Sequence, residues 1–303
     1  MCFLAVSGVS DAYRSPAGTE ALIQYVTTRL AKAPDIFYGH GSINAEMEAW
    51  ILVHGLLEQK VVDSIDVHFE RIVEDCLSLR LRERIPAAYL TGLAWYFNRW
   101  FDVAQGVMIP RSPIGEMIET NLRPWLREPP ERILDLCCGT GCLGVMAALA
   151  FPGTSVTLVD NDERALSSAR SNVVRHGVSD AVEIVKSDLF DELNPCLYDV
   201  IIANPPYVSL GELELLPDEY SHEPRTGLVA GYDGLSCWRA ILMKVGEWIS
   251  PRGVLVGETG SATVNFLNAF SSYDIYWPVL DSAVRQEDGG FGVFVADAET
   301  FLR

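Results

Sequence analysis

The sequence predicts an α/β protein in which a mostly parallel sheet of seven strands is preceded by a small helical bundle and a β-hairpin. Three features of the 303 residues predict this order. Apolar residues recur at helical spacing in the first part, aromatic and β-branched residues dominate the next, and short apolar segments then alternate with helical stretches. We therefore expect a helical domain over 1–85, a β-hairpin linker over 86–110 and an α/β domain over 111–303.

The N-terminal part has the apolar period of amphipathic helices over residues 17–83. Leu22, Val26 and Leu30 follow one another at steps of four residues, which places them on one face of a helix. Pro86 ends the last of these helices, because proline lacks the N–H that a helix interior needs. No catalytic motif lies in this part of the chain.

The later part contains a series of apolar segments that we expect to form the sheet. In a parallel sheet covered by helices on both faces, ligands bind beyond the carboxyl ends of the strands, where the strand order reverses. The residues that directly follow the segments are therefore candidates for a ligand site. The expected strands are 133–136, 155–160, 182–186, 198–203, 253–257, 274–280 and 291–296.

The net charge narrows the range of partners. The chain carries a formal charge of −18 and has a sequence pI near 4.6. Such a surface repels the phosphates of nucleic acids, so we expect no direct DNA binding, and it attracts basic proteins. The same charge is also compatible with a role in solubility alone. No apolar run approaches the roughly 18 residues of a membrane-spanning helix, so no membrane partner is expected.

Seven cysteines are present, and Cys137, Cys138 and Cys142 lie close together. They form no C-x-x-C pair and have no histidine nearby, so we expect no bound metal. An odd number of cysteines without a disulfide framework is typical of reduced thiols in the cytoplasm. We therefore expect a cytoplasmic protein and leave its oligomeric state open.

A glycine-rich turn follows the first expected strand. It runs from Asp135 through Cys137 to Gly139 and Gly141, and glycines let the backbone of such a turn approach a ligand closely. An acid, Asp160, ends the second strand, where a carboxylate can grip the two hydroxyls of a ribose. The pattern predicts a nucleotide-like cofactor at this turn.

Two cofactors, a dinucleotide and S-adenosylmethionine, are candidates for this glycine-rich turn. A dinucleotide site needs G-x-G-x-x-G, and Cys137 stands where the first glycine belongs. S-adenosylmethionine carries no phosphate but has an ammonium group, which a carboxylate at Asp135 attracts. A third acid, Asp188, follows the third strand and can accept a bond from the adenine amino group. Acids after three successive strands favour S-adenosylmethionine, although each acid taken alone is also typical of a helix cap.

The fourth strand ends in Asn204-Pro205-Pro206-Tyr207, which is suited to methylation of a planar amino nitrogen. Such a nitrogen is a weak nucleophile because its lone pair is delocalised. The Asn204 side-chain oxygen can accept one N–H and the Pro205 carbonyl the other, which aims the nitrogen and stabilises charge that develops on it. Pro206 stiffens the backbone, and Tyr207 can pack its ring against the flat group. The other interpretation is a Pro-Pro turn that only closes a strand.

Together these motifs resemble the protein N5-glutamine methyltransferases, which modify translation proteins. Within that family the chain looks like the branch acting on large-subunit ribosomal protein L-three. It has Pro-Arg-Ser-Pro-Ile-Gly-Glu at 110–116, where the branch acting on peptide-release factors typically has Pro-Arg-Pro-Asp/Glu-Thr-Glu. Cys138 and Gly144 depart from the threonine and alanine expected of the family. The matching stretches are 38–41, 83–91, 109–116, 204–208, 222–224, 227–228 and 233–235.

The resemblance implies a Rossmann-like class I methyltransferase fold, with S-adenosylmethionine as methyl donor and S-adenosylhomocysteine as product. It also implies that the helical domain recognises the substrate, a basic ribosomal protein. The expected catalytic residues are Asn204, Pro205, Pro206 and Tyr207. The residues expected to bind the substrate are Asn204, Pro205, Tyr207 and Arg111, and those expected to bind the cofactor are Asp135, Cys137, Gly139, Gly141, Asp160, Asp188 and Asn204.

Other interpretations stay open at this point. Methylation of release factors uses the same residues. A DNA or RNA amino-methyltransferase uses the same motif on a flipped base, but it requires basic residues for the phosphate backbone. A non-enzymatic assembly factor is disfavoured by the intact acids and glycines, and an NAD-dependent dehydrogenase by the glycine pattern. Arg111 can also serve in a structural salt bridge with Glu116 rather than at the site.

Overall fold

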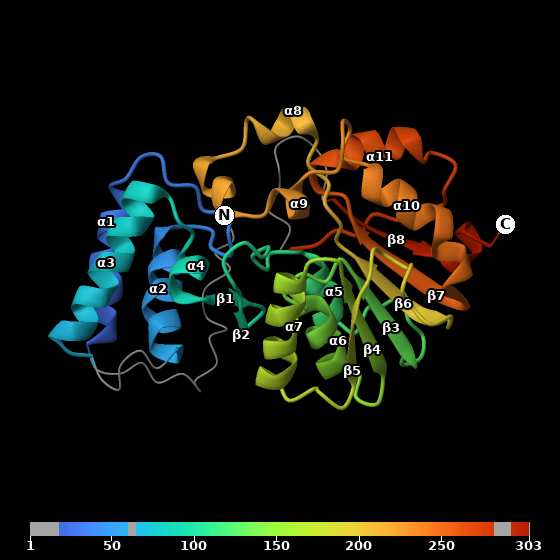
Figure 1. The fold of residues 1–303 in the computed structure, drawn as a ribbon, viewed down its shortest axis with the longest axis horizontal. Helices are drawn as coiled ribbons and strands as arrows, with labels where there is room; N and C mark the ends of the chain where they lie inside the picture. Colours follow the sequence, from blue (N-terminus) through green and yellow to red (C-terminus); the bar gives the residue numbers. More distant parts are fainter. Residues whose placement is uncertain (1–17, 60–64, 282–291, 303) are drawn as a thin grey trace. The chain divides into compact units, whose positions relative to one another are not determined.

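The computed structural model describes residues 18–59, 65–281 and 292–302, and the chain divides into two units. The first holds the described residues up to Val103 together with Ile109–Arg111. The second holds Ala104–Met108 and the described residues from Ser112 onward. Figure 1 draws the first unit in blue to teal and the second mainly from green to red. Cys2 and the first residue of the expected strand at 291–296 lie outside the described residues.

The first unit contains the helices that the apolar period predicts over 17–83, together with a short helix, α4, inside the segment 86–110 that was expected to form only strands and turns. They are α1 (Thr19–Ala31), α2 (Ala45–Glu58), α3 (Val67–Glu83) and α4 (Ala87–Thr91). The Asn44 side chain caps α2 by accepting the N–H of Met47 over 2.8 Å. Asp66 caps α3 by accepting the N–H groups of His68 and Phe69, each over 2.9 Å. Short polar residues therefore start both helices.

A buried ion pair joins α2 to α3. Arg80 of α3 donates to the Glu48 carboxylate of α2, and both side chains are almost fully buried. Ser42 donates to the other oxygen of Glu48 over 2.6 Å, and Arg80 also donates to the Phe37 carbonyl over 2.8 Å. These hydrogen bonds offset part of the cost of removing the two charges from water.

The expected hairpin is present in the first unit. β1 (Leu93–Tyr96) pairs antiparallel with β2 (Arg99–Asp102), and Tyr96 lies opposite Arg99. The two residues of the turn, Phe97 and Asn98, have φ values of 42° and 58°. Positive φ at both positions defines the type I′ turn whose twist matches that of the strands, and asparagine favours it.

The second unit is built on a six-stranded sheet with the order β5-β4-β3-β6-β7-β8. All neighbours are parallel except β7 and β8. The chain moves outward from β3 to β5 and then returns to place β6 on the other side of β3, so the strand order reverses between β3 and β6 (Figure 1). The strands are β3 (Arg132–Leu136), β4 (Ser155–Asp160), β5 (Val182–Lys186), β6 (Tyr198–Ala203), β7 (Ile249–Glu258) and β8 (Val293–Asp297).

Helices connect these strands. They are α5 (Ile114–Glu119), α6 (Cys142–Ala150), α7 (Glu163–Arg175), α8 (Leu210–Leu213), α9 (Arg225–Leu228), α10 (Ser236–Lys244) and α11 (Thr263–Ala269). The short 3-10 helices are η1 (Asp218–His222), η2 (Val245–Glu247), η3 (Gly260–Ala262) and η4 (Ala298–Thr300). α6 and α7 contact each other and the β3–β5 half of the sheet (Figure 1). The buried rings of Trp238, Phe266 and Phe294 fill the core at the β7–β8 end.

The expected strand at 274–280 is reduced to a single bridge, so the described sheet has six strands rather than seven. Tyr276 pairs with Val295 of β8 and exchanges both backbone hydrogen bonds with it, at 2.9 and 2.8 Å. In an antiparallel ladder the next such pair lies two residues along, at Pro278 and Val293. Proline has no N–H to donate, so the ladder cannot continue in that direction.

Candidate active site

Four strands of the sheet end at the same level. Leu136 of β3 pairs with Val159 of β4 and with Ala203 of β6, and Ala203 pairs with Gly257 of β7. The next residues along these strands are Cys137, Asp160, Asn204 and Glu258. The point where the strand order reverses lies between β3 and β6. The sheet therefore brings the glycine turn, the acid at the end of β4 and the Asn-Pro-Pro-Tyr motif to one edge, as the sequence predicts.

The turn after β3 has a left-handed backbone at three positions. The φ angles are 57° at Cys137, 55° at Gly139 and 74° at Gly141. A Cβ on Gly141 would lie 2.9 Å from Cδ1 of Leu158, so only glycine fits there. A Cβ on Gly139 would meet no atom within 4 Å apart from its chain neighbours, so this backbone is open to a ligand. Cys137 adopts a conformation that costs a non-glycine residue about 1–2 kcal/mol.

Asp135 lies beneath the first turn of α6 and is only 1% exposed. Its Oδ2 accepts the N–H of Gly144 over 2.8 Å. Burial raises the pKa of Asp135 to about 7; the Gly144 hydrogen bond opposes this shift and the charge of Asp160 adds to it. Among the described residues no cation pairs with Asp135. A buried carboxylate in this setting favours a cationic ligand.

Gly144 departs from the alanine expected of the family, and the packing around it gives the reason. A Cβ at this position would lie 2.0 Å from Cδ2 of Leu158 and 3.0 Å from Oδ2 of Asp135. Leu158 occupies the space that an alanine methyl would need. The glycine therefore preserves the approach of α6 to Asp135.

Asp160 closes the other side of the turn. Its Oδ2 accepts the N–H of Gly139 and its Oδ1 accepts the N–H of Asp162, each over 2.9 Å. Burial raises the pKa of Asp160, and the backbone hydrogen bonds oppose the shift. The acid predicted to grip the ribose is thus bonded to the open glycine of the turn.

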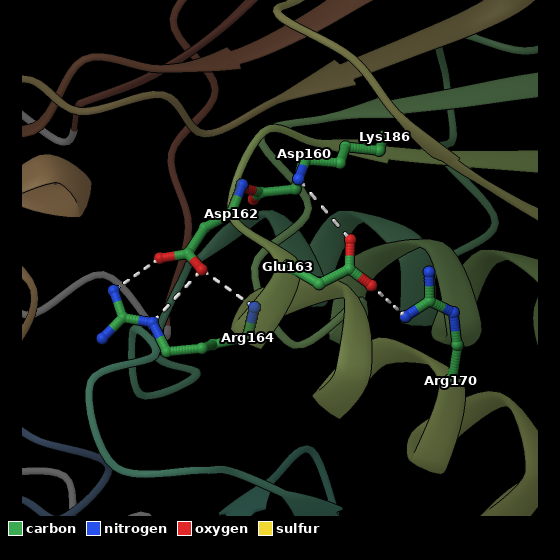
Figure 2. A network of polar contacts seen from close by, with 6 residues as sticks. All are labelled: Asp160, Asp162, Glu163, Arg164, Arg170 and Lys186. Carbon is green, nitrogen blue, oxygen red and sulfur yellow. Dashed lines mark hydrogen bonds and ion pairs between the residues drawn. The ribbon is translucent and has the colours of Figure 1, made fainter.

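The cations near Asp160 pair with other acids at the start of α7. The ion pairs drawn in Figure 2 are Arg164–Asp162 at 2.7 Å, Arg170–Glu163 at 2.7 Å and Lys186–Glu163 at 3.7 Å. Within the described part of the chain no cation pairs with Asp160 itself. Asp160 and Asp135 are therefore both acids without a paired cation among the residues that the structure describes.

Asp188 is exposed in the turn after β5. It lies close enough to Cys237, in the first turn of α10, to influence the thiol. A hydrogen bond between the thiols raises the pKa of Cys137 and lowers that of Cys237. α10 therefore contacts the turn after β3 and approaches the turn after β5, a connection that the sequence analysis did not find.

Asn204 is half-buried at the end of β6, and Pro205 is buried. No hydrogen bond from the described residues reaches the Asn204 side-chain amide. Val208, which follows the motif, donates to the Leu228 carbonyl over 2.8 Å and accepts the N–H of Ala230 over 2.9 Å. The sheet fixes the motif at one end and this bridge fixes it at the other.

Tyr207 is held by contacts on several sides. Its hydroxyl donates to Oε1 of Glu258 over 3.2 Å. A Cβ on Gly260 would lie 2.2 Å from the ring atom Cε2, and a Cβ on Gly234 would lie 2.2 Å from the Tyr207 carbonyl oxygen. Pro206, the residue before it, is half-buried. The expected packing of the ring against a substrate amide stays a prediction.

Two residues that the sequence analysis did not select complete this edge. Glu258 ends β7 and is 6% exposed. Ser112 donates its hydroxyl to Oε2 of Glu258 over 2.5 Å. A signal for Glu258 was present, because it is an acid at the end of a strand, as Asp160 is. Nothing marked Ser112 as its partner, since 146 residues separate the two.

Arg111 belongs to the first unit, where its Nη1 donates to the Ile109 carbonyl over 3.2 Å. Its expected contact with the substrate stays a prediction. In residues 18–59, 65–281 and 292–302, no group of three or more His, Cys, Asp or Glu side chains is arranged to hold a metal ion. None of the described helices combines the length and apolar character needed to cross a bilayer.

Comparison with known proteins places this arrangement in a family. The family model described as Methyltransferase small domain matches residues 120–215. The ribosomal protein uL3 glutamine methyltransferase of Bordetella pertussis is 42% identical over 276 residues, covering 86% of this chain and 90% of that protein. The chain belongs to the ribosomal protein uL3 glutamine methyltransferase family.

A second relative and one solved structure are also similar to this chain. The uL3 glutamine methyltransferase of Burkholderia pseudomallei is 37% identical, covering 84% of this chain and 88% of that protein. The solved hMettl16 catalytic domain, in complex with a 3′UTR hairpin, is 16% identical with a TM-score of 0.47, covering 83% of this chain and 92% of that chain. The two relatives confirm the branch expected from residues 110–116, and the family model and the strand order confirm the Rossmann-like methyltransferase fold.

Proposed function

We propose that this chain transfers a methyl group from S-adenosylmethionine to the side-chain amide nitrogen of a glutamine in ribosomal protein uL3. Membership of the uL3 glutamine methyltransferase family supports the reaction and the substrate. One observation in the structure carries the proposal. The half-buried Asn204 amide lies at the strand end beside the glycine turn and makes no hydrogen bond with the described residues. A partly buried amide in that state needs polar partners, and a substrate amide supplies them.

The residues around the turn fit a cationic cofactor. Asp135 and Asp160 are acids without a paired cation in the described part of the chain, and the backbone at Gly139 is open. Asp135 would hold the ammonium group, Asp160 the ribose hydroxyls and Asp188 the adenine amino group. When bound, S-adenosylmethionine supplies the methyl group and leaves as S-adenosylhomocysteine.

The Asn-Pro-Pro-Tyr motif would hold the substrate nitrogen. The side-chain oxygen of Asn204 accepts one amide hydrogen and the carbonyl of Pro205 accepts the other. Positive charge develops on the nitrogen as it is methylated, and these two oxygens stabilise that charge. The nitrogen keeps its orientation because Pro205 is buried and its backbone is stiff. No base has to remove a proton before attack, since the proton can leave afterwards.

The charge of the chain supports a basic substrate. The formal net charge of −18 attracts a ribosomal protein that is rich in lysine and arginine. We assign the recognition of uL3 to the helices of the first unit, with Arg111 near the glutamine. The reaction then belongs in the cytoplasm, where ribosomal proteins are made. The same chemistry could serve release factors or nucleic acid, so the test has to include them.

The test is a competition between substrates. Purified chain is incubated with labelled S-adenosylmethionine and, in separate reactions, unmodified uL3, an unmodified release factor and duplex DNA. We expect label on uL3 alone, and mass spectrometry should place one methyl group on a glutamine side chain. Transfer to the release factor or DNA without transfer to uL3 would overturn the proposed substrate.

The matched control replaces Tyr198 by phenylalanine. Tyr198 begins β6, the strand that ends before Asn204, and its hydroxyl bonds Thr157 within the sheet over 3.4 Å. This variant should keep its activity, whereas Asn204→Ala should lose it. Label on uL3 from Asn204→Ala at the wild-type rate would show that another group holds the glutamine.

A further inference from the structure

A single buried carboxylate joins three distant segments of the second unit. Glu258 ends β7, and each of its oxygens accepts a hydroxyl: Oε1 from Tyr207 over 3.2 Å and Oε2 from Ser112 over 2.5 Å. The carboxylate is 6% exposed, and Ser112 is 4% exposed. Because a buried carboxylate requires hydrogen bonds to offset desolvation, each hydroxyl is held where Glu258 places it.

The register of the sheet puts Glu258 next to the reacting motif. Ala203 of β6 pairs with Gly257 of β7, and the residues that follow are Asn204 and Glu258. Trp238 donates its indole N–H to the Glu258 carbonyl over 3.1 Å, which fixes the backbone of Glu258 against α10. Glu258 is therefore anchored at the end of the strand that adjoins the one bearing Asn204.

The chain of bonds continues beyond Ser112. The Ser112 hydroxyl oxygen accepts the N–H of Ile114 over 3.2 Å at the start of α5, while its hydrogen goes to Glu258. On the other side, Gly260 lies directly against the Tyr207 ring. The Tyr207 ring is thus bonded at its hydroxyl and confined at one edge, which restricts where it can lie.

We propose that Glu258 is a positioning residue for methyl transfer: by binding the Tyr207 and Ser112 hydroxyls, it fixes the Asn-Pro-Pro-Tyr motif so that Asn204 and Pro205 present their oxygens at one place. Glu258 acts through Tyr207 and makes no bond to the substrate. This assignment rests on the proposed function for its kinetic test, and a structural test that needs no activity is given below.

The kinetic test is a double-mutant cycle with Glu258→Gln, Tyr207→Phe and both together. Glutamine keeps one acceptor oxygen where the carboxylate has two, and phenylalanine keeps the ring without the hydroxyl. Each single variant should lower kcat about tenfold or more, because a small misplacement of reacting groups is expensive, while KM for the cofactor changes little. The double variant should be no slower than the slower single variant, since the two groups act as one unit.

Two results would overturn the assignment. Losses that multiply in the double variant would mean that Glu258 and Tyr207 act independently. A rise in the cofactor Kd of Glu258→Gln as large as its loss in kcat would place Glu258 in the cofactor site. Tyr198→Phe is the matched control, because it removes a hydroxyl from the opposite end of β6 and should leave kcat unchanged. A comparable loss of kcat in this control would mean that hydroxyl loss acts through general destabilisation.

The structural test uses tyrosine-labelled protein and nuclear magnetic resonance, without substrate. The Tyr207 ring signal, assigned by its loss in Tyr207→Phe, should shift in Glu258→Gln and to a smaller extent in Ser112→Ala, while the Tyr198 signal stays in place. An unmoved Tyr207 signal in both variants would reject the positioning role even if the wild type methylates uL3. A shifted signal in a protein that methylates nothing would instead reject the proposed function and keep the contact.

Discussion

The carboxylate of Asp160, at the end of β4, accepts the backbone N–H of Gly139 in the turn after β3 over 2.9 Å. The acid predicted to grip the cofactor ribose therefore also holds the turn over which the cofactor would lie. The other oxygen of Asp160 accepts the N–H of Asp162. The Asp160 carboxylate therefore binds both the turn after β3 and the residue before α7. These are the two segments predicted to flank the cofactor.

Replacing Asp160 by alanine should weaken cofactor binding. The change removes two acceptor bonds to backbone N–H groups and the anion expected to bind the ribose. We expect the Kd for S-adenosylmethionine, measured by calorimetry, to rise at least about tenfold, since a hydrogen bond to a charged group contributes about 1.5–3 kcal/mol. Asp191→Ala is the control, because Asp191 makes an exposed ion pair with Lys244. Equal affinities in wild type and Asp160→Ala would show that another group holds the ribose.

Replacing Asn204 by alanine should separate turnover from cofactor binding. We propose that this side chain binds the reacting nitrogen, so we expect kcat to fall by about 100-fold or more, as when a group that stabilises transition-state charge is removed. The cofactor Kd should stay within about twofold. Single-turnover methylation of uL3 and calorimetry of cofactor binding give the two numbers. A parallel loss of both would mean that Asn204 belongs to the cofactor site and not to the reacting site.

The stability of the ligand-free protein should depend on pH through Asp135. Burial raises the folded-state pKa of Asp135 to about 7, above the value of about 4 for a free carboxyl. Between these values the folded protein binds more protons than the unfolded chain, so the free energy of unfolding should decrease as the pH rises from about 4 to about 7. Urea titrations across this range should show a flatter profile for Asp135→Asn. Identical profiles would mean that Asp135 is ionised throughout.

Ionisation of Asp135 should also change the affinity for the cofactor. As the pH rises the affinity should increase, whereas the stability of the protein should decrease. A cation binds the ionised carboxylate, so below pH about 7 binding must first expel the proton. The affinity of wild-type protein for S-adenosylmethionine should therefore increase as the pH rises toward and past 7. In Asp135→Asn the affinity should be weak and should vary less across this range. A wild-type affinity that is constant from pH 5 to 8 would contradict contact between Asp135 and the ammonium group.

Gly260→Ala should disturb the Asn-Pro-Pro-Tyr motif from a position outside its four residues. The φ angle at Gly260 is 44°, and a Cβ there would lie 2.2 Å from the Tyr207 ring. We expect a lower kcat and a lower melting temperature, because the ring or the loop must move. Gly211→Ala is the matched control, since a Cβ at Gly211 meets nothing within 4 Å. Full activity in Gly260→Ala would show that the position of the ring is unimportant.

Salt should weaken the binding of uL3 more than the binding of the cofactor. Dissolved salt screens the attraction between the net charge of −18 and a basic protein. The carboxylate of Asp135 is buried, so salt screens its interactions much less. Raising salt from about 0.05 to about 0.5 M should increase the Kd for uL3 by the larger factor. If both constants respond equally little, electrostatic attraction does not select the substrate.

Local patterns predicted most of the sheet. The expected strands at 155–160, 182–186 and 198–203 have the observed limits, because alternation and flanking polar residues define short buried strands. β7 begins at Ile249, four residues before the expected 253. Ile249 pairs with Tyr198 of β6, and the register of the two strands shifts between Tyr198 and Val200. The strand expected at 274–280 failed because a single proline lacks the donor that the ladder needed.

Some residues of the candidate site could be predicted from the sequence, and the contacts between others could not. Asp135, Asp160 and Asn204 could be selected because each lies at or directly after the end of a strand, and the sheet then places strand ends together. The links between Tyr207, Ser112 and Glu258 could not, because they depend on side chains that meet across 51 and 146 residues of sequence. The contact between Cys137 and Cys237 is of the same kind. The ends of strands can be predicted from local sequence. The side-chain contacts between them depend on how the chain packs and cannot.

The close fit of Gly234 and Gly260 around Tyr207 has a consequence for comparing genomes. Any substitution at these two glycines would push a side chain into the tyrosine while leaving the four-residue signature intact. A search that scores only the signature would classify such a sequence as an active enzyme. Inspecting both glycines together with the signature would separate working copies from those in which the tyrosine has been displaced.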